Sequence, residues 1–327
     1  MRHKSVSYAK YGYIFSIPFV LAFLVFSLYP IIYTAIIGFT DLKGLGKTDL
    51  KFLANPFQNF VLIMKNPSFQ QSITNTSLIW IINFIPQILL ALLLAVWFTS
   101  HRRRIAGQGA FKVLFYMPNI ITAATVALLF YSLFGYPIGP ANDLFKILGL
   151  SQEPVNFLIQ KWTARGIVAF IQFWMWYGYS MIVFISGVLG MNPELFEAAE
   201  IDGASGAQIF FFITLPGLRT ILLYMLVTSL IGGLQMFDVP KLFLLGGPDN
   251  ATLTTSVFIY NQAFSGSYLY NRAAAASMVM FVIIAILSAV LFFIMRDKYA
   301  ARLNKEKKSR IKSLKKADKA AARRVAV

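Results

Sequence analysis

The chain has 327 residues, of which 57% are hydrophobic and only 13% are charged, and its formal net charge is +17. Soluble domains carry about 25% charged residues, so this composition indicates a membrane protein. The absence of cysteine excludes disulfides, thiolate metal sites and cysteine nucleophiles. The two histidines, His3 and His101, lie among basic residues, which argues against a histidine metal site.

Apolar runs recur along the chain. Each has about 20 residues or more, the length that a helix needs to cross a hydrocarbon core. The first starts after basic residues like a signal peptide, but it is too long and lacks a small-x-small cleavage site, so we expect an uncleaved span. The sequence therefore predicts an all-α polytopic membrane protein with six transmembrane helices, at about 11–39, 73–99, 110–134, 166–190, 218–245 and 273–295.

Basic residues gather at three places: the N-terminal segment 1–10, the cluster Arg102–Arg104, and the tail 296–327, which holds thirteen Lys and Arg against three carboxylates. With six spans both termini share one side, and the positive-inside rule makes that side the cytoplasm. The predicted domains are a cytoplasmic N-terminus (1–10), a transmembrane domain (11–295) and a basic cytoplasmic tail. We expect the tail to anchor topology against anionic lipid rather than to bind nucleic acid.

Polar segments between the spans fit loops. In the first, 40–71, the triplet Gly46-Lys47-Thr48 suggests a phosphate-binding loop, but Asp41 occupies the position of the required earlier glycine and no buried strand precedes it. Segment 135–165 alternates turn formers with short apolar runs, which predicts an external loop with a small interfacial helix. The run Gly246–Asn250 predicts a sharp external turn before 252–264.

The cytoplasmic loop 191–217 carries four carboxylates, Glu194, Glu197, Glu200 and Asp202, in a chain that is otherwise apolar and basic. Its small residues predict a short helix with a smooth face, stopped at Pro216 and followed by a turn. Glu197 and Asp202 suit charged contacts or helix caps, because carboxylates near a helix start are favoured by its dipole. Such a helix is a plausible docking surface for another protein.

The spacing of Glu197-Ala198-Ala199, Gly203, Ile213 and Leu215-Pro216 resembles the EAA loop of binding-protein-dependent ABC importer permeases. Flanking motifs resemble the carbohydrate-uptake branch, the relatives of the glycerol-phosphate and maltose permeases: Asn192-Pro193-Glu194-Leu195, Gln235-Met236-Phe237-Asp238 and Gly246-Gly247-Pro248. The resemblance implies a type I ABC importer permease fold and an ATPase-coupling helix at Glu197, Ala198, Ala199, Asp202, Gly203, Leu215 and Pro216.

The same resemblance implies partners for the chain. They are a second permease subunit in a heterodimer, two ABC ATPase subunits that carry ATP and Mg, and an extracellular or periplasmic solute-binding protein received by 135–165 and 246–272. The chain itself would bind no cofactor or metal and would be no enzyme. It would lie in the cytoplasmic (inner) membrane of a bacterium or archaeon.

A sugar path needs hydroxyl or amide partners and aromatic faces at membrane depth, where unpaired polar groups are costly. Span four offers Gln172, Trp176 and Tyr179 on one helical face, at i, i+4 and i+7. The candidate path residues are Asn119, Gln172, Trp176, Tyr179, Tyr224, Gln235 and Asp238, with further polar groups at Asn83, Gln87, Thr228 and Ser229. The alternative is that the aromatics form interfacial belts and the amides join helices.

Three other functions stay open at this point. An ABC permease for a different solute, such as phosphate or peptide, fits the same loop motif. An ion-coupled secondary transporter would need ionisable residues within the spans, where Asp238 is the single candidate carboxylate. A membrane-embedded hydrolase would need a nucleophile with a base, or metal ligands, and the cysteine and histidine counts argue against both.

Overall fold

The computed structural model describes residues 9–100, 106–266 and 268–295. Segments 1–8, 101–105 and 296–327, to which the sequence assigns much of the basic cytoplasmic charge, lie outside the described residues. Within the described ranges the elements are the helices α1 (Ala9–Phe23), η1 (Leu24–Leu28), α2 (Tyr29–Gly38), α3 (Gln58–Met64), α4 (Pro67–Thr99), α5 (Gln108–Ile120), α6 (Ala123–Leu133), α7 (Pro140–Ile147), α8 (Lys161–Leu189), α9 (Pro193–Ile201), α10 (Gly206–Ile209), η2 (Phe210–Thr214), α11 (Leu215–Gly217), α12 (Arg219–Leu234), α13 (Asp238–Leu244), α14 (Thr255–Phe264) and α15 (Tyr270–Met295). The predicted all-α class is confirmed.

Five helical segments are long and apolar enough to cross a membrane, and the bent pair α5 and α6 makes a sixth span if it is counted as one. The five are Lys10–Gly38, Pro67–Thr99, Lys161–Leu189, Arg219–Leu244 and Tyr270–Met295. The spans Pro67–Thr99 and Lys161–Leu189 begin several residues earlier than the predicted 73–99 and 166–190, because polar first turns belong to the same helices. At α4, for example, the Asn66 side chain caps the helix by accepting the backbone N–H groups of Ser68 and Phe69.

The prediction of one continuous span over 110–134 is wrong. α5 ends at Ile120, α6 begins at Ala123, and their axes differ by 90°. Ile121 and Thr122 have extended backbones, and the Thr122 hydroxyl accepts the N–H of Thr125 at 3.3 Å, so a new helix starts there. The apolar run hides this break, because a capping threonine adds no charge that would interrupt the hydropathy pattern.

The centre of the molecule is the helix pair α4 and α8, the most extensive packing between two elements. α5 crosses α8 at Gly178, where an added Cβ would lie 2.0 Å from the backbone oxygen of Phe115. α12 approaches α8 at Gly187, where a Cβ would lie 2.4 Å from the Ile221 side chain. Glycines thus let these backbones approach closely, as is common between helices in membranes.

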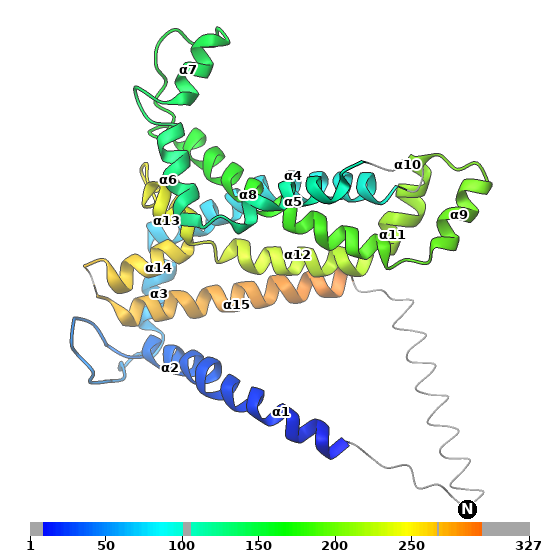
Figure 1. Cartoon of the computed structure of the whole chain (residues 1–327). Helices are drawn as coiled ribbons and strands as arrows, with labels where there is room; N and C mark the ends of the chain where they lie inside the picture. Colours follow the sequence, from blue (N-terminus) through cyan, green and yellow to red (C-terminus); the bar gives the residue numbers. More distant parts are fainter. Residues whose placement is uncertain (1–8, 101–105, 267, 296–327) are drawn as a thin grey trace, which may run out of the picture.

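The first span stands apart from this centre. In Lys10–Gly38 the most apolar window has no buried residue among those the structure describes, and α2 makes its contacts along α15. In Figure 1 α1 points away from the other helices. The described side chains of α1 are therefore exposed on all sides, as expected of a helix surrounded by lipid or by another subunit.

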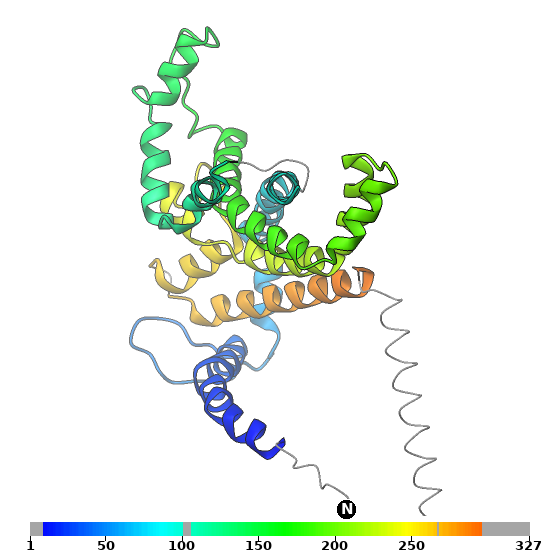
Figure 2. The same ribbon diagram turned by 45° about the vertical axis from the view of Figure 1, so that its right-hand side comes forward.

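The remaining short helices gather at the two ends of the long ones. In both views α9 and α10 project at one end, whereas α6, α7, α13 and α14 lie at the opposite end (Figures 1 and 2). α7 is the small helix predicted within 135–165. The acidic loop and the polar loops after spans three and five are therefore separated by the full length of α8.

Candidate functional site

The acidic loop forms a capped helix, α9. The Asn192 side chain caps its start by accepting the N–H of Glu194 at 3.1 Å, Pro193 occupies the first turn, and the Glu194 carboxylate lies near the positive end of the helix dipole. At the other end, the N–H of Gly203 bonds to the Glu200 carbonyl and that of Ala204 bonds to the Ala199 carbonyl. These two bonds form a Schellman motif, which ends the helix sharply.

Gly203 has a φ of +75°, the left-handed conformation that a Schellman motif requires. An added Cβ there would meet nothing within 4 Å. Within this chain, glycine is therefore needed at position 203 for its backbone conformation and not for space.

Glu197 lies in the middle of α9 and Asp202 at its C-cap, so neither caps a helix start; Asn192 and Ser205 do. The other predicted role of the two carboxylates, as charged contacts, stays a prediction. The predicted helix end at Pro216 is wrong for α9, which ends at Ile201. Pro216 lies near the end of the next helical stretch, Gly206–Gly217.

One face of α9 is exposed and the other is anchored. Glu197, Ala198 and Asp202 are exposed, and Ile201 is 86% exposed although it is apolar. On the opposite face Phe196 is buried in a cluster with Phe184 and Val188 of α8, and Leu215 packs against this cluster. Phe196 therefore attaches α9 to the hydrophobic cluster to which α8 contributes.

A cavity of about 390 Å³ lies between α4, α8, α12 and the start of α13. Five of the seven predicted path residues line it: Gln172, Trp176, Tyr179, Gln235 and Asp238. The predicted shared face of Gln172, Trp176 and Tyr179 is thus observed. Its volume lies within the range of about 300–1,000 Å³ that is typical of small-molecule sites.

The other two path residues, Asn119 and Tyr224, do not line the cavity. The Asn119 amide donates to the Met175 carbonyl at 3.2 Å, which ties α5 to α8. Tyr224 is exposed and lies outside the cavity lining. Asn119 therefore joins two helices, and neither residue faces the cavity.

In the α4 wall, sequence reasoning named Asn83 and Gln87 as further polar groups but missed Trp80. Trp80, Asn83 and Gln87 line the cavity together, and they occupy one helical face at i, i+3 and i+7. The Trp80 indole N–H donates to the Ser229 hydroxyl at 3.2 Å and packs directly on Gly233, where a Cβ would lie 2.0 Å from the ring. The Gln87 amide donates to Ser180 at 2.8 Å. The spacing of these three residues was the available signal.

The chemistry of the cavity is that of a binding site. It presents amides, hydroxyls, indole and phenol rings and one carboxylate, from residues such as Asn83, Gln172, Trp176, Thr228 and Asp238. Among the described residues no group of three or more His, Cys, Asp or Glu side chains gathers as a metal site would require. A multi-pass helical protein with such a cavity, and with an anchored helix projecting at one end, has the layout of a membrane transport component.

Comparison with known families identifies the family to which the chain belongs. Residues 62–305 match the model described as "Binding-protein-dependent transport system inner membrane component". The chain belongs to this family. Segment 191–217 and all of the cavity walls fall within the matched residues.

Two curated relatives illustrate the likeness. The chain is 30% identical over 289 residues to the lactose transport system permease protein LacF of Rhizobium radiobacter, covering 88% of this chain and 94% of that protein. It is 31% identical over 283 residues to the arabinooligosaccharides transport system permease protein AraP of Bacillus subtilis, covering 85% and 86%.

A solved structure shares the fold. A bacterial ABC transporter involved in the import of the acidic polysaccharide alginate contains a chain that superposes with a TM-score of 0.74 at 24% identity, covering 88% of this chain and 95% of that one. The same degree of similarity, TM-score 0.74, is found for that transporter in complex with an alginate pentasaccharide-bound periplasmic protein. The type I importer permease fold is thereby confirmed.

Proposed function

We propose that this chain is the permease subunit of an ATP-driven importer that takes up a sugar or oligosaccharide delivered by an external solute-binding protein. The observation that supports this most directly is the cavity, because its amides, hydroxyls and aromatic rings are the groups that bind sugar hydroxyls and ring faces. Relatives named for lactose and for arabinooligosaccharides support the same substrate class.

In this proposal the exposed face of α9 seats on a separate ATPase subunit, which binds ATP and Mg and hydrolyses the nucleotide. Glu197, Ala198, Ala199, Asp202 and Gly203 form the contact, while Leu215 and Pro216 return the chain to the bundle. Closing of the ATPase dimer moves α9, and the Phe196 anchor carries that motion to α8. α8 also lines the cavity. One helix therefore connects α9 with the cavity, and the ATPase can change the position of that helix.

The proposed assembly contains this chain, a second permease as heterodimer partner, two ATPases and a solute-binding protein outside a bacterial or archaeal inner membrane. Alternating access then opens the cavity first outward and then inward. The chain needs no cofactor of its own for this role, since it provides only the conduit.

Reconstitution tests the proposal. The complete complex, placed in lipid vesicles with internal ATP and its binding protein outside, should take up labelled lactose or arabinooligosaccharide only when ATP and binding protein are both present. Glu197→Lys should lower uptake by about tenfold or more while leaving α9 folded, since Glu197 is exposed and an interface charge reversal typically costs a few kcal/mol.

The matched control is Asp49→Lys, which makes the same charge change at an exposed position in loop 40–71, far from α9, and should transport normally. Uptake of phosphate or peptide but not sugar would reject the substrate class. Uptake driven by an ion gradient without ATP would reject the importer mechanism itself.

A further inference from the structure

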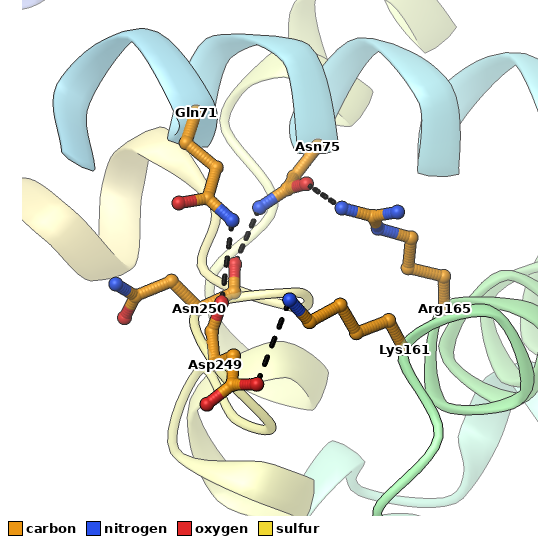
Figure 3. A network of polar contacts seen from close by, with 6 residues as sticks. All are labelled: Gln71, Asn75, Lys161, Arg165, Asp249 and Asn250. Carbon is orange, nitrogen blue, oxygen red and sulfur yellow. Dashed lines mark hydrogen bonds and ion pairs between the residues drawn. The ribbon is translucent and has the colours of Figure 1, made fainter. Parts of the chain in front are cut away.

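The loop between α13 and α14, residues 245–254 and here called the outer loop, is folded back onto α4 and α8. Leu245, Gly246, Asp249 and Asn250 have positive φ values of 52°, 91°, 44° and 58°. Figure 3 shows side chains of α4 and α8 gathered around Asp249 and Asn250 of this loop. Such backbone turns leave carbonyls without partners inside the loop, so these must be satisfied from elsewhere.

Four outer-loop carbonyls accept side-chain hydrogen bonds from the two central helices. They are Asp249 from Gln71 (3.2 Å), Asn250 from Asn75 (2.6 Å), Leu253 from Asn75 (3.1 Å) and Ala251 from Arg165 Nε (3.0 Å). The outer loop is therefore attached to both α4 and α8 at the end of the molecule opposite α9.

Asn75 and Arg165 join these attachments into one unit. Arg165 Nη2 donates to Asn75 Oδ1 at 2.7 Å, so fully buried Asn75 uses its acceptor on α8 and both of its N–H donors on the outer loop. The other described contacts of Arg165 are the Ala251 carbonyl and the Trp162 ring, 5.0 Å away. Every polar function of Asn75 is thus committed, and its loss would leave buried carbonyls unpaired.

The outer loop in turn holds the break between α12 and α13. The hydroxyls of its last residue and of the next two residues donate to the carbonyls freed where α12 ends: Thr254 to Met236 (2.9 Å), Thr255 to Leu234 (3.2 Å) and Ser256 to Gln235 (3.0 Å). Hydroxyls commonly stabilise interrupted membrane helices in this way. The break is what places Gln235 and Asp238 on the cavity wall.

We propose that Asn75 and Arg165 are positioning residues for transport, which hold the outer loop on α4 and α8 and thereby fix Gln235 and Asp238 at the cavity. The proposal rests on the function proposed above. Because Arg165 lies on the same helix as Gln172 and Trp176, a movement of α8 carries the outer loop and the break with it. The α8 wall of the cavity and the wall at the break between α12 and α13 then move together when α9 is displaced.

Asn75→Asp separates the two roles of this side chain. It keeps the oxygen that Arg165 uses, and even strengthens that pair, but it replaces the donor that lies 2.6 Å from the Asn250 oxygen with a second oxygen. The outer loop is then repelled while the link between α4 and α8 remains. Arg165→Lys is the second variant, since a single ammonium group cannot serve both the Ala251 carbonyl and Asn75.

The matched control is Lys161→Gln, which removes the ion pair with Asp249 on the same loop. That pair is 3.5 Å long, and its side chains are 52% and 79% exposed. Exposed pairs contribute little, so this variant should leave the outer loop in place on α4 and α8.

The first measurement needs no substrate. The chain has no cysteine, so spin labels can be placed at cysteines introduced for Leu89 on α4 and Leu242 on α13, both exposed. In the assembled complex the distance distribution between them should be narrow, should broaden or shift in Asn75→Asp and Arg165→Lys, and should stay unchanged in Lys161→Gln. An unchanged distribution in Asn75→Asp overturns the proposal.

The second measurement is the number of solute molecules taken up per ATP hydrolysed in vesicles, with labelled lactose and arabinooligosaccharide as probes. The ratio should fall about tenfold in Asn75→Asp, as expected for losing buried hydrogen bonds, and adding Gln235→Ala should lower it no further. A lower yield of complex with an unchanged ratio, or effects that multiply in the double variant, shows a merely structural role and overturns the proposal. If the unmodified complex carries neither sugar, the proposed function fails, while the spin-label result still decides this inference.

Discussion

At Gly203 a single backbone conformation determines where the loop 191–217 turns. The positive φ and the two Schellman bonds stop α9 after Ile201 and send the chain towards the Ser205 cap of α10. A residue other than glycine there costs about 1–3 kcal/mol of backbone strain, although the chain itself offers space for a side chain.

Comparison of Gly203→Ala with Gly203→Trp separates backbone strain from bulk. Both should lower the thermal stability of the loop, by roughly the same 1–3 kcal/mol, because both must adopt the left-handed conformation. If α9 docks on an ATPase with Gly203 close to the partner, Trp alone should weaken ATPase binding, by about tenfold or more. Pull-down of the ATPase by the purified permease measures this; equal binding by both variants would place Gly203 outside the contact.

At the scale of elements, α8 connects the features that matter for function. Its outer end carries Lys161 and Arg165 beside the outer loop, its middle lines the cavity, and its inner end packs on Phe196 of α9. This arrangement depends on close helix crossings, and the closest of them on α8 is with α5 at Gly178.

Gly178→Ala should disrupt that crossing. The new Cβ would lie 2.0 Å from the Phe115 oxygen and 2.8 Å from its carbonyl carbon, and a backbone cannot move aside as a flexible side chain can. We expect a loss of at least about 1–3 kcal/mol, seen as a lower melting temperature of the purified complex. Gly166→Ala on the same helix is the control, because nothing lies within 4 Å of its Cβ, and it should be neutral or stabilising.

At the scale of the whole molecule, the long helices separate two groups of short ones. α7 and the outer loop lie at one end and α9 at the other (Figure 1). The positive-inside rule predicts that α9 lies in the cytoplasm and that α7 therefore lies outside.

Cysteine labelling tests this orientation. In this cysteine-free chain, Lys146→Cys on α7 and Glu197→Cys on α9 each introduce one exposed thiol. An impermeant maleimide should label Lys146→Cys in intact cells, and Glu197→Cys only after the membrane is opened. Labelling of Glu197→Cys in intact cells would reverse the assigned sides and remove α9 from reach of a cytoplasmic ATPase.

The sequence by itself determined the membrane class, the all-α fold, the family and the shared face of Gln172, Trp176 and Tyr179. Hydropathy, charge distribution and helical spacing are local properties, so they can be read along the chain. The start of α4, the 90° turn at Ile121–Thr122 and the break before Asp238 depend on capping and hydroxyl hydrogen bonds. These bonds leave the hydropathy pattern unchanged.

Only the tertiary structure decided which polar residues share the cavity. Trp80, Asn83 and Gln87 joined it because α4 packs on α8, whereas Asn119 was taken up by a helix contact with Met175. Asn75 bonds to Arg165, 90 positions away in the sequence, and to Asn250 of the outer loop, 175 positions away. Such partners meet only when the helices pack, since no local pattern encodes which distant carbonyl an amide will bind.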